Sequence, residues 1–156
     1  MQGRRGPAAG IPVPEGTSQW RSWGSPKGAV AMDRQGYIDL VTRYLRLCEE
    51  RKLAEAAQFL APSAVLISPG GRSFSSLEER TEASKGRYRW VKKNMKAWDV
   101  LLEGDGKAVV YCMGTLYGED PHGKPFSDVR FIDRFVIEDG KIALQEVWND
   151  LGVRTA

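Results

Sequence analysis

The first half of the chain carries apolar residues at the spacing of helices. From Asp33 onward they recur every three or four positions and form a single stripe, which predicts a helix. A second short helix is predicted over LAEAAQFL, and a short apolar strand over APSAVLISPGG. Ser76, with Glu79 three residues later, forms a capping box that predicts a third helix ending at about Arg87. The first stripe consists of Tyr37, Leu40, Val41, Tyr44, Leu45 and Cys48.

The second half instead alternates between apolar and polar residues, which is typical of β-strands. The connecting segments GDGK, EDPHGKP and EDGK are rich in turn formers, and Asp139-Gly140 is a hairpin signal because both residues tolerate a positive φ. Helices followed by a meander of strands predict an α+β domain in which helices cover one face of a curved antiparallel sheet. The predicted strands span about 90–103, 107–118, 126–138 and 141–149.

One charged residue interrupts the inner face predicted for the third long strand. Phe131, Asp133, Phe135 and Ile137 alternate together and point to the same side. A carboxyl group among large apolar side chains loses its hydration, which disfavours the charged form and favours the neutral acid. The alternative is that Asp133 lies at an exposed or bulged position, or pairs with a neighbouring arginine.

The N-terminal segment differs in composition from everything that follows it. Residues 1–31 contain six Gly and four Pro and show no apolar periodicity. Such a segment buries too little surface to offset the entropy lost on ordering, and it has no apolar region typical of a secretory signal. The sequence therefore predicts a flexible leader over 1–31 and a single domain over 32–156. A length of 156 residues with 42% hydrophobic residues suits one globular core.

Charge and cysteine usage exclude several functional classes. The net charge of +3 comes from the leader, and the remainder carries equal numbers of basic and acidic residues. The basic cluster RYRWVKKNMK is interpreted as a solvated face, so no nucleic-acid surface is predicted. No apolar run is long enough to span a membrane. Cys48 and Cys112 match no metal or redox spacing, which favours a reduced cytoplasmic protein. His122, the only histidine, lies in a loop and suggests neither a metal site nor a catalytic triad.

Two segments resemble the ends of a known fold family. YLRLCEERKLAEAAQFLAPSAVLISPGG and FIDRFVIEDGKIALQEVW resemble the nuclear transport factor 2-like superfamily, in particular its SnoaL-like and ketosteroid isomerase-like members. The resemblance covers about residues 35–150. It implies a cone-shaped (cystatin-like) fold in which the curved sheet packs on the N-terminal helices and opens into a hydrophobic pocket. It further implies a small-molecule ligand, no cofactor, and a homodimer formed through the outer face of the sheet.

The resemblance also assigns roles to individual residues. In ketosteroid isomerases, a helix tyrosine and a protonated strand aspartic acid form an oxyanion hole, and a second aspartate is the general base. Tyr44 and Asp133 occupy the positions of the first two, whereas the position of the base holds Ser68. In SnoaL-like cyclases, an aspartate placed like Asp133 is instead the acid/base. The alternative for Tyr44 is ordinary core packing.

Further candidates lie on the last two strands. Leu144, Glu146 and Trp148 alternate together, and the resemblance turns this face toward the pocket. Glu146 is then a candidate replacement base, with a rim salt bridge as the alternative. Trp148 is predicted to form a pocket wall together with Phe131 and Phe135.

The sequence thus favours a SnoaL-like enzyme using acid/base proton transfer on a small carbonyl-bearing or phenolic molecule. Isomerase, cyclase, dehydratase and lyase chemistry all remain open. The alternative is a non-catalytic ligand-binding or dimerisation module of the same fold, which Ser68 in place of a base favours. A nuclear transport adaptor is a third, weaker hypothesis. Steroid isomerase activity is predicted to be negligible, because a serine hydroxyl without an adjacent base is too weak a proton acceptor.

Overall fold

The computed structural model describes residues 32–153, so the predicted leader lies outside the described residues. The predicted order of helices followed by a strand meander is confirmed. The elements are α1 (Arg34–Glu49), α2 (Leu53–Ala57), β1 (Leu60–Ile67), β2 (Ser73–Phe74), α3 (Leu77–Ser84), β3 (Trp90–Gly104), β4 (Lys107–Glu119), β5 (Pro125–Glu138), β6 (Lys141–Asn149) and the 3-10 helix η1 (Leu151–Val153).

Local sequence signals account for the ends of these elements. The Asp33 side chain accepts the Gly36 N–H at 2.8 Å and begins α1, and the Ser76 hydroxyl accepts the Glu79 N–H at 3.2 Å and begins α3. Both bonds satisfy amides that have no partner within the helix. None of the helices in the described part of the chain is long and apolar enough to cross a membrane.

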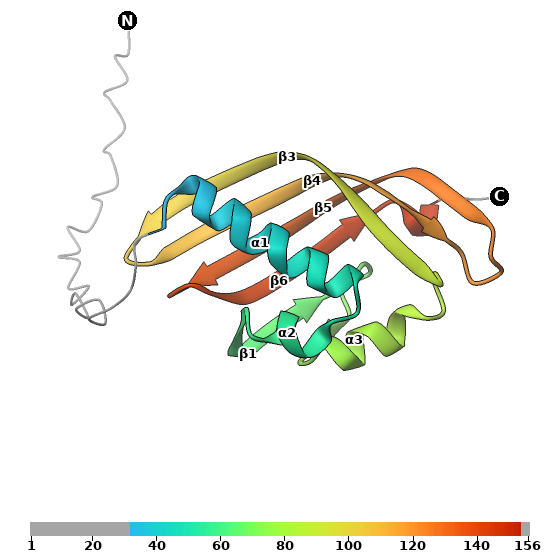
Figure 1. Ribbon diagram of the computed structural model, residues 1–156, viewed down its shortest axis with the longest axis horizontal. Coiled ribbons are helices and arrows are strands. Elements are labelled where there is room, and N and C mark those ends of the chain that lie inside the picture. The colour runs from blue at the N-terminus through green and yellow to red at the C-terminus, as the bar shows by residue number, and fades with distance from the viewer. Residues whose placement is uncertain (1–31, 154–156) are drawn as a thin grey trace, which may run out of the picture.

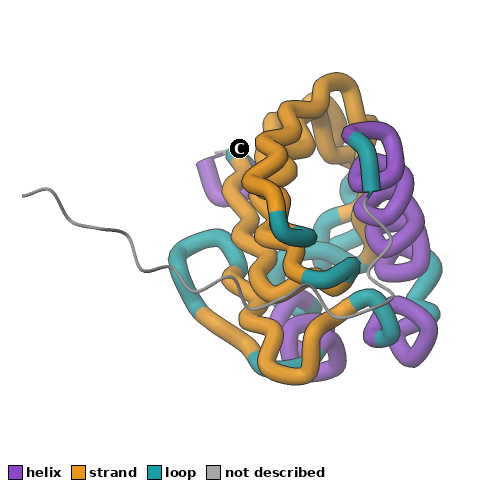
Figure 2. The backbone as a smooth tube through the Cα atoms, turned by 90° about the vertical axis from the view of Figure 1, so that its left-hand side faces the viewer, coloured by secondary structure: helices purple, strands orange, loops and turns teal. Residues whose placement is uncertain are grey.

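The strands form one six-stranded sheet in the order β2-β1-β6-β5-β4-β3. All neighbouring pairs are antiparallel except β1 and β6, which run parallel, so the sheet is mixed rather than wholly antiparallel. The three helices lie on one side of the sheet, with α1 crossing its long strands (Figure 1). Viewed from the end, the strands curl around the helical side, in agreement with the predicted cone (Figure 2).

The curvature of the sheet depends on a close approach of two strands. The register between β3 and β4 shifts between Met95 and Ala97, which marks a bulge that bends the strand. Gly114 lies opposite this bulge, where an added Cβ would stand 1.9 Å from the Asn94 carbonyl oxygen. Only a residue without a side chain fits there, and Gly114 thereby lets β3 fold over the helical side.

The concave face of the sheet and the helices enclose the hydrophobic core. The alternation predicted for β5 is confirmed, since Phe131, Asp133, Phe135 and Ile137 are buried. Tyr44 from α1 meets Phe135 edge to face, with ring centroids 6.1 Å apart. Asp133, which is 0% exposed, is therefore an interior residue and does not lie at a frayed position.

Candidate functional site

A cavity of about 100 Å³ lies between the ends of α1 and α3 and the concave face of the sheet. Apolar side chains such as Leu45, Val91 and Val147 form part of its wall, but charged groups from both helices and from β3 lie beside them. Its wall is thus mixed, in contrast to the hydrophobic pocket that the resemblance implies. The lining residues with polar side chains are Cys48, Glu49, Arg51, Ser68, Arg80, Thr81, Ser84, Arg87, Tyr88, Lys93, Gln145 and Asn149.

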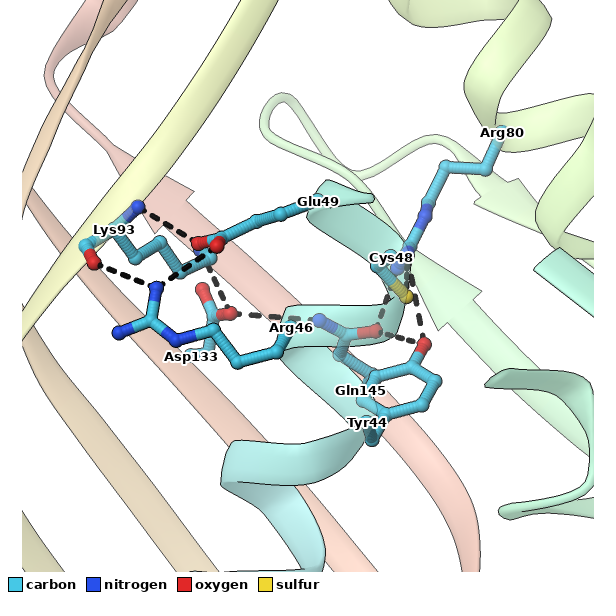
Figure 3. A network of polar contacts seen from close by, with 8 residues as sticks. All are labelled: Tyr44, Arg46, Cys48, Glu49, Arg80, Lys93, Asp133 and Gln145. Atoms are coloured by element: carbon cyan, nitrogen blue, oxygen red, sulfur yellow. Dashed lines mark hydrogen bonds and ion pairs between the residues drawn. The ribbon is translucent and has the colours of Figure 1, made fainter. Parts of the chain in front are cut away.

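Lys93 on β3 connects this cavity to the buried Asp133. Its ammonium lies 2.9 Å from Asp133 Oδ2 and 4.1 Å from the centroid of the Phe131 ring, and its side chain is 15% exposed. An ammonium at this distance offsets part of the electrostatic cost of burying the Asp133 carboxyl group. Lys93 itself lines the cavity, whereas Asp133 is not a lining residue. Figure 3 shows the contact between the two side chains. The other carboxylate oxygen, Oδ1, has no hydrogen-bond partner among the described residues.

Gln145 on β6 links Asp133 to the other side of the cavity. Its amide oxygen accepts a hydrogen bond from the Tyr44 hydroxyl at 2.7 Å and another from Arg80 Nη1 at 2.6 Å. Its amide nitrogen donates to Asp133 Oδ2 at 3.4 Å. A continuous chain of polar contacts therefore runs from Arg80 through Gln145 to Asp133 and Lys93 (Figure 3).

Arg80 enters the cavity from α3. Its Nη2 group lies 3.4 Å from the Tyr44 hydroxyl and 3.9 Å from Cys48 Sγ. Burial raises the pKa of the Cys48 thiol, although the positive charge of Arg80 acts in the opposite direction. The thiol is thus held in its protonated form, which argues against a nucleophilic role for Cys48.

The structure brings Tyr44 and Asp133 into one network, but not in the arrangement of an oxyanion hole. Both residues bind the amide group of Gln145, from opposite ends. The Tyr44 hydroxyl already donates its hydrogen bond to the Gln145 amide oxygen. Neither Tyr44 nor Asp133 is among the residues that line the cavity. In the arrangement implied by the resemblance, the Tyr44 hydroxyl donates to a ligand carbonyl, but here it donates to the Gln145 amide oxygen.

The face of β6 predicted to point toward the pocket requires a correction. Gln145, Val147 and Asn149 line the cavity, whereas Glu146 and Trp148 lie on the opposite face. Glu146 accepts a bond from Arg134 at 3.0 Å, and Trp148 is 48% exposed. The prediction was wrong by one residue, because both faces of β6 carry apolar and polar side chains and the alternation alone does not distinguish them.

Three further predicted residues lie close to the cavity in different ways. Ser68 follows β1, is 8% exposed and belongs to the lining. Phe131 and Phe135 are buried in the core and are not lining residues. Phe131 nevertheless contributes indirectly, because its ring face supports the Lys93 ammonium.

Sequence reasoning missed Lys93, Arg80 and Gln145, although each left a signal. Lys93 alternates with the apolar residues Val91 and Met95 in β3, just as Asp133 alternates with phenylalanines in β5. The sequence instead favours a solvated face for the basic cluster around Lys93. Arg80 shares a helical stripe with Leu77, Thr81 and Ser84. Gln145 belongs to the face of β6 that was assigned to the outside.

The buried phenol of Tyr44 predicts a loss of stability at high pH. Burial raises the pKa of Tyr44 above its ordinary 10.0, while Arg80 opposes this shift. Above pH 10 the unfolded chain releases this proton and the folded chain keeps it, so stability that is present below pH 10 falls as the pH rises. Between pH 10 and 11, wild type should lose about 1 kcal/mol more unfolding free energy than Tyr44→Phe, measured by urea titration. Equal losses in the two proteins would contradict this prediction.

Comparison with known proteins supports the fold. The family model described as a SnoaL-like domain matches residues 41–145. Among solved structures, Aln2 from a Streptomyces species aligns with a TM-score of 0.63 at 15% identity, covering 80% of this chain and 99% of Aln2. TerC co-crystallised with polyporic acid gives 0.60 at 15% identity, with 74% and 92% covered. The beta subunit of benzoate 1,2-dioxygenase from Burkholderia mallei gives 0.62 at 14% identity, with 81% and 97% covered.

Comparison with curated proteins gives no match. At these identities, the similar structures show a shared fold and not a shared reaction. The family match, by contrast, spans most of the described chain, from within α1 to within β6. The chain therefore belongs to the SnoaL-like domain family.

Proposed function

We propose that the chain is a cofactor-independent enzyme that moves a proton on a small carbonyl-bearing or phenolic molecule bound in the cavity. The observation that carries this proposal is the Lys93–Asp133 pair, in which the ammonium faces the cavity and the carboxylate is wholly buried. Burying an ion pair costs desolvation free energy because both ions lose their hydration, so a buried pair next to a cavity favours a functional role over a purely structural one.

In the proposed reaction on a carbonyl-bearing ligand, Lys93 donates an ammonium proton to the carbonyl oxygen. The resulting free amine then accepts a proton from a ligand carbon, so Lys93 ends the cycle as it began. Asp133 stabilises the ammonium and holds it at the cavity wall. The net change is the displacement of one proton and one double bond in the ligand, as in a tautomerisation or isomerisation.

Arg80 would assist this step through its charge. A fixed cation in a partly enclosed site polarises the ligand carbonyl, which makes the proton on the neighbouring carbon more acidic. Tyr44 and Gln145 contribute by holding Arg80, since both accept hydrogen bonds from its guanidinium. In this proposal Tyr44 and Gln145 are positioning residues, and Glu146 has no part because it lies on the other face of β6.

Deuterium exchange tests the proposal without knowledge of the natural substrate. Monocyclic ketones and phenols are incubated with the protein in D₂O, and loss of the proton next to the carbonyl or hydroxyl-bearing carbon is followed by NMR. Wild type should accelerate exchange for at least one ligand. Lys93→Gln and Asp133→Asn should retain less than a tenth of that rate. Lys92→Gln, a change at the exposed neighbouring residue, should behave as wild type.

The proposal fails if no ligand exchanges faster than in buffer, or if Lys93→Gln exchanges as fast as wild type. Circular dichroism melting of each variant separates a loss of chemistry from a loss of fold. A rate loss in a folded Lys93→Gln protein, together with a normal rate in Lys92→Gln, assigns the effect to the cavity-facing ammonium.

A non-catalytic binding module is the second candidate function, and two observations favour it. Ser68, which lines the cavity, offers no base at the family's position. The cavity of about 100 Å³ is also smaller than common ligand pockets, which measure about 300 Å³ or more. A ligand that binds with the stoichiometry of one per chain, but undergoes no exchange in D₂O, would favour this candidate over the enzyme.

A further inference from the structure

We propose that the cavity recognises a carboxylate, so that its ligands are small organic acids with an apolar body. This inference rests on the proposed function in that both use the same cavity, but it concerns binding and does not require turnover. It is carried by the charges of the lining residues and by the partners of Arg80.

Positive charge exceeds negative charge around the cavity. Among the described residues that line it, Arg51, Arg80, Arg87 and Lys93 are cationic, and Glu49 carries the only carboxylate. That carboxylate is already engaged through both of its oxygens. Its Oε2 atom lies 2.8 Å from Arg46 Nη1, and its Oε1 atom accepts the backbone N–H of Lys93 at 2.8 Å.

Within the described part of the chain, the arginines of the cavity form no ion pair with an acidic side chain. Lys93 is neutralised by Asp133, but none of the ion pairs formed within residues 32–153 includes Arg51, Arg80 or Arg87. Arg80 is the critical case because it is only partly exposed. A guanidinium withdrawn from water without a counterion is unfavourable, and an anion bound beside it would remove this cost.

Arg80 also retains hydrogen-bonding capacity. A guanidinium has five N–H donors, and the acceptors in contact with Arg80 are the Gln145 amide oxygen, the Tyr44 hydroxyl and, at 3.9 Å, Cys48 Sγ. All three are uncharged groups. The two inner contacts fix the plane of the guanidinium, which leaves its remaining donors for a planar, two-oxygen acceptor such as a carboxylate.

The apolar part of the wall defines the rest of the ligand. Leu45, Leu53, Val91, Leu116 and Val147 line the same cavity as the arginines. A ligand that fits both features has an anionic group at one end and a compact hydrocarbon body at the other. A single aromatic ring with a carboxyl group matches this description, and benzoate is therefore a suitable probe.

Benzoate and benzamide differ in charge but hardly in shape, and their affinities test the inference. Binding is followed by NMR chemical-shift titration of the ¹⁵N-labelled protein. Benzoate should bind at least about tenfold more tightly than benzamide, the usual effect of a charge-assisted hydrogen bond. Arg80→Gln should abolish this preference. Lys85→Gln removes a positive charge from the exposed end of α3, outside the cavity, and should preserve it.

Equal affinity for the two probes, no binding of either, or equal weakening by Lys85→Gln would overturn the inference. If Arg80→Gln does not fold, the wild-type comparison of benzoate with benzamide and the Arg87→Gln variant still decide the question, with Arg87→Gln expected to reduce the preference about threefold. Benzoate binding without proton exchange on any ligand would leave this inference standing and remove the proposed enzyme. Proton exchange on neutral ketones without a preference for benzoate over benzamide would support the proposed enzyme and remove this inference.

Discussion

Replacing Lys93 by methionine should lower the free energy of unfolding by about 3 to 5 kcal/mol. The substitution keeps most of the apolar stem of Lys93 but removes the ammonium that lies 2.9 Å from Asp133. Asp133 is 0% exposed, and its remaining neighbour in the network, the Gln145 amide, donates only one hydrogen bond at 3.4 Å. The variant therefore buries a carboxylate without a counterion. Urea unfolding at neutral pH measures the loss.

The double variant Lys93→Met/Asp133→Leu serves as the test of this explanation. Removing both charges eliminates the uncompensated carboxylate, so much of the stability should return, because apolar replacements of a buried ion pair are often neutral or stabilising. Lys92→Met changes the exposed neighbour on the opposite face of β3 and should alter stability by less than about 0.5 kcal/mol. A Lys93→Met protein as stable as Lys92→Met would show that the ion pair does not hold Asp133 in the interior.

Replacing Ser68 by aspartate should raise isomerase activity toward a small β,γ-unsaturated ketone above that of the unmodified protein. The reaction needs a base that removes a proton from one carbon and returns it two carbons away. Ser68 lines the cavity that Lys93 and Arg80 also line, so an aspartate there would supply the base beside two cations that stabilise the enolate oxygen. We expect a gain of about 10²-fold or more, which is the usual contribution of a positioned base.

Cyclohex-3-enone suits this experiment better than a steroid, because the cavity measures about 100 Å³. Formation of the conjugated enone is followed by its ultraviolet absorbance. Ser68→Asn is the matched control, since it has nearly the same shape but no basic group. Isomerisation as fast in the unmodified protein as in Ser68→Asp would contradict the role assigned to Ser68. A gain that is equal in Ser68→Asp and Ser68→Asn would show that the effect does not arise from a base.

The fold was predictable because its local signals agree with one another. The capping box at Ser76, the hairpin turn at Asp139-Gly140 and the alternation through Asp133 each specify an element that the structure contains. The candidate site was only partly predictable. Tyr44, Ser68 and Asp133 lie in or behind the cavity wall, but their partners come from elements distant in the chain, and pairing between distant side chains leaves no periodic pattern.

The β6 strand illustrates this limit. Glu146 and Gln145 are adjacent polar residues, and the choice of which one faces inward depends on register against β1 and β5. Lys93 illustrates another, because a lysine in a basic cluster is normally solvated and its burial becomes favourable only when Asp133 is placed opposite. The homodimer and the cytoplasmic location stay predictions.

The parallel pairing of β1 with β6 has a consequence for the order of folding. Short turns join the strands β3, β4, β5 and β6, so the contacts between neighbouring strands are local and form quickly. Pairing Leu66 with Gln145 instead closes a loop that contains most of the domain, and its larger entropic cost delays it. Ser68 and Gln145 are brought together only by that pairing. We therefore expect the cavity to assemble last, after the meander that supplies Lys93 and Asp133 has formed.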